Sequence, residues 1–455
     1  MQQMNAVSEE TRALAEYIST MPGRDLPAEV AEKTRQHILD TVASMVSGSS
    51  LLAGQKAADF IRIHNDGSDA VVIGTNLVTT AAYAALANGM SAHADETDDS
   101  HAPSGGHPGC GVVPAALAVA ERKGASGDTL LRAVVAGYDV GTRVSLALGM
   151  GRQRMHRSRT SSHALVSVFG AAAAAAVIEE LDEQQTRYAL SYTAQLASGV
   201  TSWLRDGRHV EKAFVFAGMP AHNGVLAALM TSAGLDGVED AFAGEPNFLD
   251  AWSPDPDRSL LSAGLGENYE IMRTNIKKYC VGSPAQAAVQ AVEDLLGAHD
   301  FKTSEVESIE IRIPAGAANV VDSRSMPDIN VQYLVAGTLV DGNCNFIMAH
   351  DEDRMRDDPI IRKLIESTTL VADEEMEPVR QATVMLRTSR GELSRHVPHV
   401  RGTADEPMTT AEVEKKADEI MIPVVGAERS QRLIEAVREI ERIDNVKQLR
   451  ELLGA

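Results

Sequence analysis

The sequence predicts a mostly α-helical protein with a smaller α+β part. Apolar residues recur at intervals of three to four over much of residues 1–265, which is the period of an amphipathic helix. Two segments beyond residue 300 instead alternate apolar and polar residues, as a half-buried strand does. The tail, residues 410–453, is charged and again has a helical pattern. We therefore expect a large helical region, then an α+β region, then a helical C-terminus.

The first half of the chain supplies most of the expected helices. Apolar residues share one helical face over 14–21 and again over 30–45, where Pro27 precedes the first turn. Further helices are expected over Thr80–Ala92, Val112–Lys123, Asp128–Leu148 and Val210–Ala233. The unbroken alanine run Ala171–Ala176 presents small side chains on all sides, which favours close packing. We expect this helix to be central and buried.

The strand-like segments lie in the second half. Over Val306–Ile313, isoleucines alternate with charged residues, and over Thr383–Val397 a similar alternation resumes after Gly391. The first segment predicts a strand and the second a β-hairpin. Helices are expected between them, at Pro284–Leu296 and Asn330–Asp341.

The charge balance narrows the possible partners. The chain has 455 residues, with 42 Lys and Arg against 64 Asp and Glu, so its formal net charge is −22. An acidic surface repels phosphate backbones and anionic lipids, and we expect neither a nucleic-acid nor a membrane partner. A local cluster of basic side chains could still bind an anionic substrate. The arginines of the run 152–159 could bind substrate carboxylates or the acidic face of a partner chain.

Cysteine usage and hydropathy indicate the compartment. The three cysteines are scattered without a CxxC pair, which fits a reducing compartment and predicts no zinc site or disulfide framework. The first ten residues are polar, without the apolar core of a secretory signal. No uninterrupted apolar stretch reaches the roughly 18 residues that a membrane helix needs. We expect a cytoplasmic protein.

The densest polar segment is His93–His107, which holds three histidines and four carboxylates. Its Gly and Pro content predicts a loop between two Ala-rich helices, and loops on rigid helices often carry functional sites. A solvated acidic loop is the plain alternative. Histidine and carboxylate can ligate metals, but the spacing matches no ligand motif and HExxH is absent, so no metal is predicted.

At this segment the chain resembles the MmgE/PrpD family, which includes 2-methylcitrate dehydratase, cis-aconitate decarboxylase and iminodisuccinate epimerase. Five motifs carry the resemblance, in the family's order: Asn88-Gly89 with His93 and Asp98-Asp99; His107-Pro108 with Pro114-Ala115 and Ala120-Glu121; Gly137-Tyr138-Asp139-Val140 with Arg143; Phe169-Gly170 with Ala171–Ala176; and Lys277-Lys278-Tyr279. One such motif would be weak evidence, but five in order are specific.

The resemblance implies an architecture and a class of chemistry. It implies a large all-helical domain over residues 1–265, completed by 405–455, and a smaller α+β lid domain over 266–404. It also implies a homodimer that acts on a small di- or tricarboxylic acid without metal or cofactor.

The resemblance also implies the site residues. As catalytic residues it implies His107, Lys277, Glu96, Tyr333 and His163. As substrate-binding residues it implies Asp99, Ser100, His101 and Lys212. Ser161 stands where the family has a histidine before its alanine helix, and His163 follows two residues later. Gly282 and Gln286 stand where dehydratases and decarboxylases of the family often have histidines, which suggests a different substrate of the same chemical class.

The expected chemistry is removal of a proton next to a carboxylate. Such a step needs a base near neutral pKa and fixed cations for the developing charge. His107 or His163 could be the base, Lys277 the cation, and Tyr333 or His101 the acid for a leaving hydroxyl. We expect histidine and lysine from the two halves of the chain to meet in one cleft. A dehydratase is the leading interpretation, an epimerase or decarboxylase the second, and a non-catalytic carboxylate-binding protein the most remote.

Overall fold

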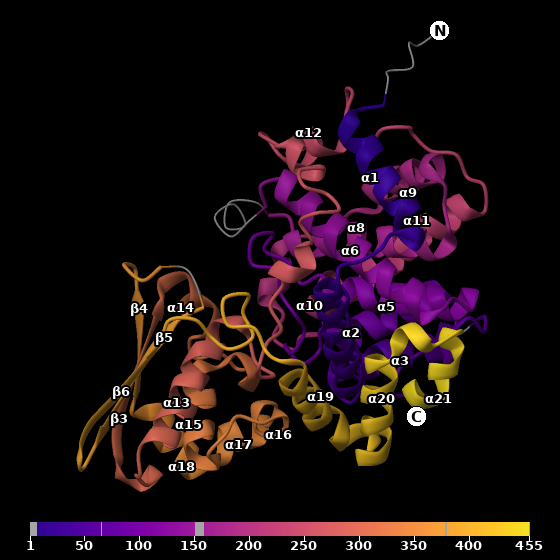
Figure 1. Cartoon of the computed structure of the whole chain (residues 1–455). Helices are drawn as coiled ribbons and strands as arrows, with labels where there is room; N and C mark the ends of the chain where they lie inside the picture. The colour runs from indigo at the N-terminus through magenta and orange to yellow at the C-terminus, as the bar shows by residue number, and fades with distance from the viewer. Residues whose placement is uncertain (1–6, 65, 151–158, 378–379, 455) are drawn as a thin grey trace. The chain divides into compact units, whose positions relative to one another are not determined.

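The computed structural model describes residues 7–64, 66–150, 159–377 and 380–454 (Figure 1). The chain divides into two compact units. Unit 1 contains residues 1–94, 98–275 and 413–455, and unit 2 contains 95–97 and 276–412. The sequence had placed the main boundaries at 265 and 404. Arg152, Arg154 and Arg157 of the basic run lie outside the described residues.

Unit 1 is helical, apart from the two-residue strands β1 (Ala70–Val71) and β2 (Val78–Thr79), which pair antiparallel. Its helices are α1 (Glu9–Thr20), α2 (Ala28–Ser49), α3 (Leu52–His64), α4 (Ala81–Ala92), α5 (Gly109–Lys123), α6 (Gly127–Ala147), α8 (Ser162–Glu179), α9 (Glu183–Leu196), α10 (Val210–Ala213), α11 (Met219–Ser232), α12 (Phe248–Trp252), α19 (Thr410–Val425), α20 (Ala427–Arg438) and α21 (Arg450–Leu453). The mostly helical class predicted from the sequence is confirmed.

The alanine-rich helix α8 is the centre of unit 1. Every residue of α8 is buried, and the helix packs against α5, α6, α9 and α11. Small residues allow this close approach: a Cβ on Gly141 of α6 would lie 2.2 Å from the carbonyl oxygen of Val166 in α8. The prediction of a central buried helix is therefore confirmed.

The C-terminal segment belongs to unit 1. Its backbone joins the α5–α6 turn, since Gly127 N donates to Ile443 O and Val446 N donates to Ala125 O, at 2.8 Å each. Lys416 of α19 also donates to Asp40 of α2 at 2.5 Å, and both side chains are buried. Burial raises the pKa of Asp40 to about 6, although the Lys416 charge opposes the rise. The last helices thus complete the helical unit.

Unit 2 is built on a four-stranded sheet of order β4-β3-β5-β6. The strands are β3 (Val306–Pro314), β4 (Thr368–Asp373), β5 (Ala382–Thr388) and β6 (Gly391–Val397), and only the β3–β4 pair is parallel. The predicted strand and hairpin are confirmed, whereas β4 was missed. Its helices are α13 (Gln286–Ala298), α14 (Ala315–Val321), α15 (Val331–Asp341), α16 (Phe346–Ala349), α17 (Glu352–Asp357) and α18 (Pro359–Glu366). Helix α13 covers one face of the β5–β6 hairpin.

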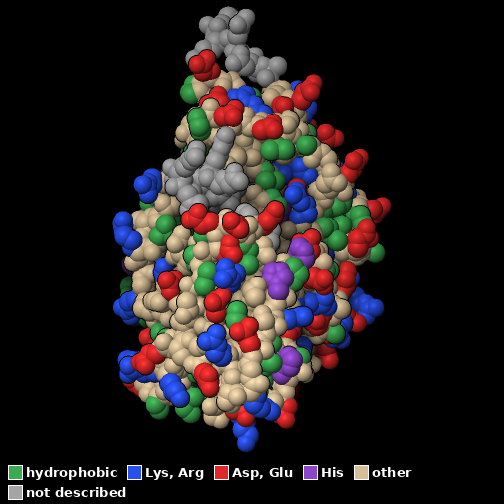
Figure 2. Space-filling model, turned by 90° about the vertical axis from the view of Figure 1, so that its left-hand side faces the viewer, with side chains coloured by type: hydrophobic (Ala, Val, Ile, Leu, Met, Phe, Trp, Pro, Cys, Tyr) green, Lys and Arg blue, Asp and Glu red, His purple; other side chains and the backbone are tan. Residues whose placement is uncertain are grey.

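Charged side chains are mixed on the face shown in Figure 2, rather than gathered by sign. On the sheet of unit 2, Arg312 of β3 lies 3.1 Å from Glu310 and 3.3 Å from Asp373. Such exposed pairs contribute little to stability. They fit the polar positions of the alternating strand pattern.

Two helical segments are long and apolar enough to cross a membrane by length and composition, Ser162–Glu179 and Val210–Ser232. Neither segment is an uninterrupted apolar stretch, since the first contains His163 and the second contains Glu211 and Lys212. All of the first window and 61% of the second are buried inside the protein, as in a core helix, so the two segments are weak evidence for a span. The expected absence of a membrane partner stays a prediction.

Candidate functional site

Four histidines from separate segments of unit 1 gather around one point, and we call them the histidine cluster: His93, His107, His163 and His209. His93 caps the C-terminus of α4, His107 ends the loop before α5, His163 lies in the first turn of α8, and His209 precedes α10. Neighbouring ring centroids are 5.1 to 5.3 Å apart. The cluster is nearly enclosed, since none of the four residues is more than 8% exposed.

Phe216 contacts three members of the histidine cluster, His93, His107 and His163. Its ring stacks on His163 at 3.8 Å and 15° and on His93 at 4.3 Å and 19°, while Trp203 meets it edge-on at 4.7 Å. Phe216 lies in a five-residue π-helical segment, η3 (Phe214–Gly218), between α10 and α11. Such widened turns occur often at functional sites. The predicted helix 210–233 is therefore present but interrupted where it meets the cluster.

Asp98 connects two of the histidines. One of its carboxylate oxygens, Oδ2, lies 2.9 Å from His93 Nδ1 and 3.1 Å from His107 Nδ1. Asp98 is completely buried. A buried carboxylate in this place orients both rings.

The pKa of His163 is lower than that of a typical surface histidine. Burial, reinforced by the neighbouring His107, His93 and Lys212, holds the pKa of His163 well below the ordinary value of 6.5. The ring is therefore neutral near neutral pH, as a proton acceptor must be. No described residue hydrogen-bonds its Nδ1.

Lys212 supplies a cation beside the same aromatic residues. Its Nζ lies 5.2 Å from the ring centroid of Phe216 and 5.8 Å from that of Trp203. The negative face of an aromatic ring attracts a cation that lies over it. The structure thus brings together three of the predicted site residues: His107, His163 and Lys212.

Asp99 lies next to Asp98 but has other partners. It accepts hydrogen bonds from Gly109 N at 3.0 Å and from the Tyr138 hydroxyl, and it lies 2.8 Å from His37 Nδ1. All of these groups are buried. Burial raises the pKa of Tyr138, and the negative charge of Asp99 raises it further. Asp99 therefore fastens the loop that carries His107 to α2 and α6. Its predicted contact with substrate stays a prediction.

Ser100 and His101 are likewise held by protein groups. The backbone of Ser100 pairs with that of Asn275 in both directions. His101 is fully buried between Ser104 Oγ at 2.9 Å and Glu270 Oε2 at 3.0 Å. Burial alone would raise the pKa of Glu270, but the hydrogen bond and charge of His101 lower it. The roles predicted for both residues in substrate binding stay predictions.

In unit 2, a second group of side chains surrounds residues 95–97, and we call it the lysine cluster: Glu96, Lys277 and His350. Lys277 donates to the carbonyl oxygen of Glu96 and lies 3.7 Å from its carboxylate, with both side chains almost fully buried. Glu96 has φ 57°, a left-handed conformation that is uncommon outside glycine. Such outliers often mark functional positions.

His350 was not predicted, and it completes the lysine cluster. Its Nδ1 lies 2.8 Å from the carbonyl oxygen of Phe346, and its Nε2 lies 3.2 Å from that of Asp95. Carbonyl oxygens only accept, so both bonds form together only when the ring carries two protons. The expected meeting of His107 with Lys277 joins residues of different units and stays a prediction.

Tyr333 is packed in the core of unit 2. It is fully buried, and its hydroxyl donates to the carbonyl oxygen of Met348 at 2.7 Å. Burial raises the pKa of this hydroxyl. The Tyr333 hydroxyl would have to break its hydrogen bond to Met348 before it could act as the predicted acid. That role stays a prediction.

The two departures from the family's pattern have local structural explanations. Gln286 donates through Nε2 to the carbonyl oxygens of Tyr279 and Val281, each at 2.8 Å, and thereby secures the turn that follows Lys277. A Cβ on Gly282 would lie 2.9 Å from Cγ2 of Ile329. The neighbourhood of Gly282 is therefore too tight for a larger side chain without some movement.

One member of the histidine cluster, His93, could hold a metal ion together with Asp98 and Cys110. Ligand atoms of His93, Asp98 and Cys110 lie within 4.8 Å of one another, and all three residues are buried. Imidazole, carboxylate and thiolate are ligands of transition metals. In this structure the thiol of Cys110 donates to the carbonyl oxygen of His107 at 3.2 Å. The expected absence of a metal stays a prediction.

Sequence reasoning missed His93, Asp98, His209 and Phe216 at the histidine cluster of unit 1, and His350 in the lysine cluster of unit 2. His93 belongs to a motif that was recognised, so its position in the NG…H…DD segment was an available signal. No pattern marks Phe216, because a π-helical segment has the composition of an ordinary apolar helix. His209 and His350 are isolated in the sequence and gain meaning only through their neighbours in space.

A helical unit that encloses carboxylate-linked imidazoles, a neutral histidine and a lysine is typical of enzymes that move protons. Comparison with known proteins gives the family. The MmgE/PrpD N-terminal domain matches residues 12–261 and the MmgE/PrpD C-terminal domain matches residues 279–442. The chain belongs to the MmgE/PrpD family.

Three relatives are similar over 79 to 99% of this chain. The cis-aconitate decarboxylase-like protein oryM of Aspergillus oryzae is 26% identical and covers 98% of this chain and 97% of its own length. Cis-aconitate decarboxylase of Aspergillus terreus is 23% identical, with 99% and 97% covered. The mouse enzyme of that name is 24% identical over 79% of this chain and 75% of its own length. These similarities support dehydratase- or decarboxylase-type activity at the level of the family.

Proposed function

We propose that the protein is a lyase that transfers a proton at a carbon next to a carboxylate of a small di- or tricarboxylic acid, without a metal. The observation that carries this proposal is the neutral, buried His163 beside the cation Lys212. A neutral imidazole accepts the proton, and a fixed cation stabilises the carboxylate as negative charge develops on it.

Dehydration is the leading outcome. Proton removal by His163 leaves an electron pair that forms a C=C bond as hydroxide departs from the adjacent carbon. A group must protonate that hydroxyl, and His107 is suited because the carboxylate of Asp98, 3.1 Å away, stabilises its protonated ring. Two histidines in different environments then serve as base and acid.

Decarboxylation is the second candidate, because the relatives are named cis-aconitate decarboxylases. In that reaction carbon dioxide leaves first and the resulting carbanion takes up a proton. A protonated His107 would donate it, and His163 would not be required as a base. Epimerisation would need only removal and return of one proton.

One panel experiment separates these outcomes. Small di- and tricarboxylic acids, saturated, hydroxylated and unsaturated, are incubated with the protein in D2O and followed by NMR. A dehydratase produces a C=C bond from a hydroxy acid, a decarboxylase releases carbon dioxide with one deuterium at the carbon it leaves, and an epimerase incorporates deuterium without loss of a group. If no acid in the panel exchanges, loses a group or changes, the proposal is wrong.

The two histidines are distinguished by variants of the same panel. For a dehydratase, both His163→Ala and His107→Ala reduce turnover by about 100-fold or more, the usual scale of acid–base catalysis. For a decarboxylase, only His107→Ala does so. Unchanged turnover in His107→Ala would remove that residue from the mechanism of either reaction.

A further inference from the structure

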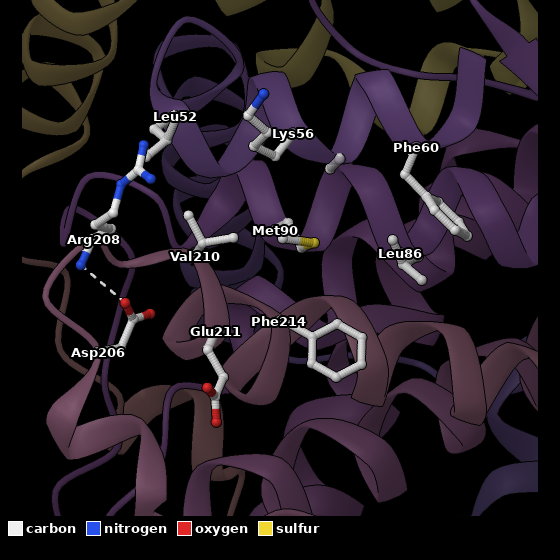
Figure 3. A pocket seen from close by; sticks show the side chains of 11 residues that line it. Leu52, Lys56, Phe60, Leu86, Met90, Asp206, Arg208, Val210, Glu211 and Phe214 are labelled. Atoms are coloured by element: carbon white, nitrogen blue, oxygen red, sulfur yellow. Dashed lines mark hydrogen bonds between the residues drawn. The ribbon is translucent and has the colours of Figure 1, made fainter. Parts of the chain in front are cut away.

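Unit 1 contains a cavity of about 640 Å³ that lies apart from the histidine cluster (Figure 3). Its wall comes from α3, α4, the loop before α10, α10 itself and the start of η3. Most of the lining is apolar: Leu52, Ala57, Phe60, Leu86, Met90, Val210 and Phe214. The volume lies within the range of small-molecule sites, roughly 300 to 1,000 Å³.

The cavity has a charged end and an apolar end. In Figure 3, the Arg208 side chain extends toward Leu52 and Lys56, whereas the rings of Phe60 and Phe214 lie with Leu86 at the opposite end. The guanidinium of Arg208 makes no hydrogen bond or ion pair with any described residue. Lys56 has only an exposed contact with Asp59 at 3.4 Å. Both cations can therefore turn toward a bound anion.

The two acidic residues of the lining have other partners. The carboxylate of Asp206 accepts the backbone N–H groups of Arg208 and Lys212, at 2.9 Å each. Glu211 accepts a hydrogen bond from Ser202 at 3.1 Å. The charged end therefore favours a negative ligand group, despite the two carboxylates nearby.

We propose that this cavity binds an amphipathic carboxylate, with its anionic head at Arg208 and Lys56 and its aliphatic chain against Phe60, Leu86 and Phe214. Each methylene removed from water adds to the affinity, and the head group gains charge-assisted hydrogen bonds. Phe60 and Phe214 are 39% and 38% exposed, so each ring is partly buried in the wall of the cavity and partly accessible to a ligand. The cations Arg208 and Lys56 at one end of this apolar lining favour an amphipathic anion as the occupant.

The occupant would touch two of the elements next to the histidine cluster, η3 and α4. Phe214 lines the cavity and Phe216 stacks on His163 and His93, and both belong to the same π-helical segment. Met90, also in the lining, lies one turn before His93 on α4. Binding therefore changes the surroundings of Trp203, whose ring lies 4.7 Å from Phe216.

Trp203 provides a reporter, because the only other tryptophan of the chain is Trp252. The full-length Trp252→Phe variant is titrated with octanoate while Trp203 fluorescence is followed, and 1-octanol serves as the uncharged comparison. We expect a saturable change with octanoate and at least about tenfold weaker binding of octanol, as the loss of a charge-assisted contact implies.

Matched arginine variants test the head-group contact. Arg208→Gln raises the Kd of octanoate about tenfold and leaves that of octanol unchanged. Arg205→Gln, at an exposed arginine that does not line the cavity, changes neither. His163→Ala keeps octanoate binding whatever its effect on turnover, so failure of this proposal and failure of the proposed function are distinguishable.

Several results would overturn the proposal. One is the absence of both a fluorescence change and heat of binding with octanoate; another is equal affinity for octanoate and octanol. A third is an Arg208→Gln variant with unchanged affinity. If sedimentation shows a dimer that Phe60→Asp dissociates, and octanoate binds only to the dissociated chain, the cavity is an interface between copies and the proposed ligand is wrong.

Discussion

The histidine cluster of unit 1 and the lysine cluster of unit 2 hold charge in different ways. In the histidine cluster, burial and the neighbouring His107, His93 and Lys212 lower the pKa of His163, while Asp98 lies 2.9 Å from His93 and 3.1 Å from His107. In the lysine cluster, Lys277 and His350 lie against backbone carbonyl groups that fix them in place. The first arrangement suits a group that must gain and lose a proton, and the second suits a charge that must stay where it is.

The largest expected effect is on proton transfer. His163→Ala reduces deuterium exchange into the substrate by about 100-fold or more, because the variant lacks the proposed base. His222→Ala is the matched control, since His222 stacks on Tyr83 in the same unit and outside the cluster. Equal losses in both variants would mean that the effect is structural.

Removal of the fixed charge in unit 2 comes next. Lys277→Met lowers kcat/KM about tenfold or more and lowers the free energy of unfolding by about 3 kcal/mol, because the carboxylate of Glu96 stays buried without its cation. Lys278→Met changes both quantities little, since Lys278 is partly exposed and pairs with Glu293. Enzyme assays and urea unfolding measure the two effects.

The pH dependence of kcat/KM tests whether burial controls His163. A lowered pKa means that the neutral base persists into acid, so the acidic limb of kcat/KM lies below pH 6.5 and activity falls as the pH drops through it. Phe216→Ala admits water to the ring and moves this limb to higher pH. A limb that stays in place would show that stacking on Phe216 does not set the charge of His163.

A smaller effect is expected at the anchor of the loop. Tyr138→Phe removes one of the hydrogen bonds to the buried Asp99 and lowers the free energy of unfolding by about 1 to 2 kcal/mol. The hydroxyl of Tyr192 donates to the exposed carbonyl oxygen of Asp236, so Tyr192→Phe changes the free energy of unfolding by less than about 0.5 kcal/mol. If the two variants are equally stable, Asp99 does not hold the loop through Tyr138.

The smallest effect is expected from metal removal. Dialysis against a chelator leaves turnover unchanged, because the proposed chemistry uses only imidazole and ammonium groups. Loss of activity, restored by one transition metal and abolished in Cys110→Ser, would instead assign the His93, Asp98 and Cys110 group to a metal site.

Much of the fold followed from local patterns. The period of the helices, the small residues of α8 and the alternation in β3 and the β5–β6 hairpin each reflect a face that must be buried. Strand β4 escaped prediction because it is short and only partly buried, with its parallel partner far away in sequence. Parallel pairing of this kind leaves no turn signal in the chain.

The candidate site was predicted only in part. His107 was found through its motif position, and His163 through its place two residues after Ser161. Lys212 was found through a correspondence with a family lysine that is one residue out of register, and the structure brings the three together. The sequence could not show that the neighbours Asp98 and Asp99 have different partners, because the loop folds back against α2 and α6. Phe216 depends on a widened helical turn, and His350 on a contact with Asp95 far away in sequence.

Chemical rescue tests most directly whether His163 is the base. In His163→Gly, added imidazole can occupy the vacated space between Phe216 and His107. The proposed mechanism predicts that imidazole restores deuterium exchange in a saturable manner, with an acidic limb near the pKa of free imidazole, and that it has no effect on His107→Gly when exchange alone is measured. Lack of rescue by imidazole and by smaller bases, in a variant that is folded and binds substrate, would contradict it.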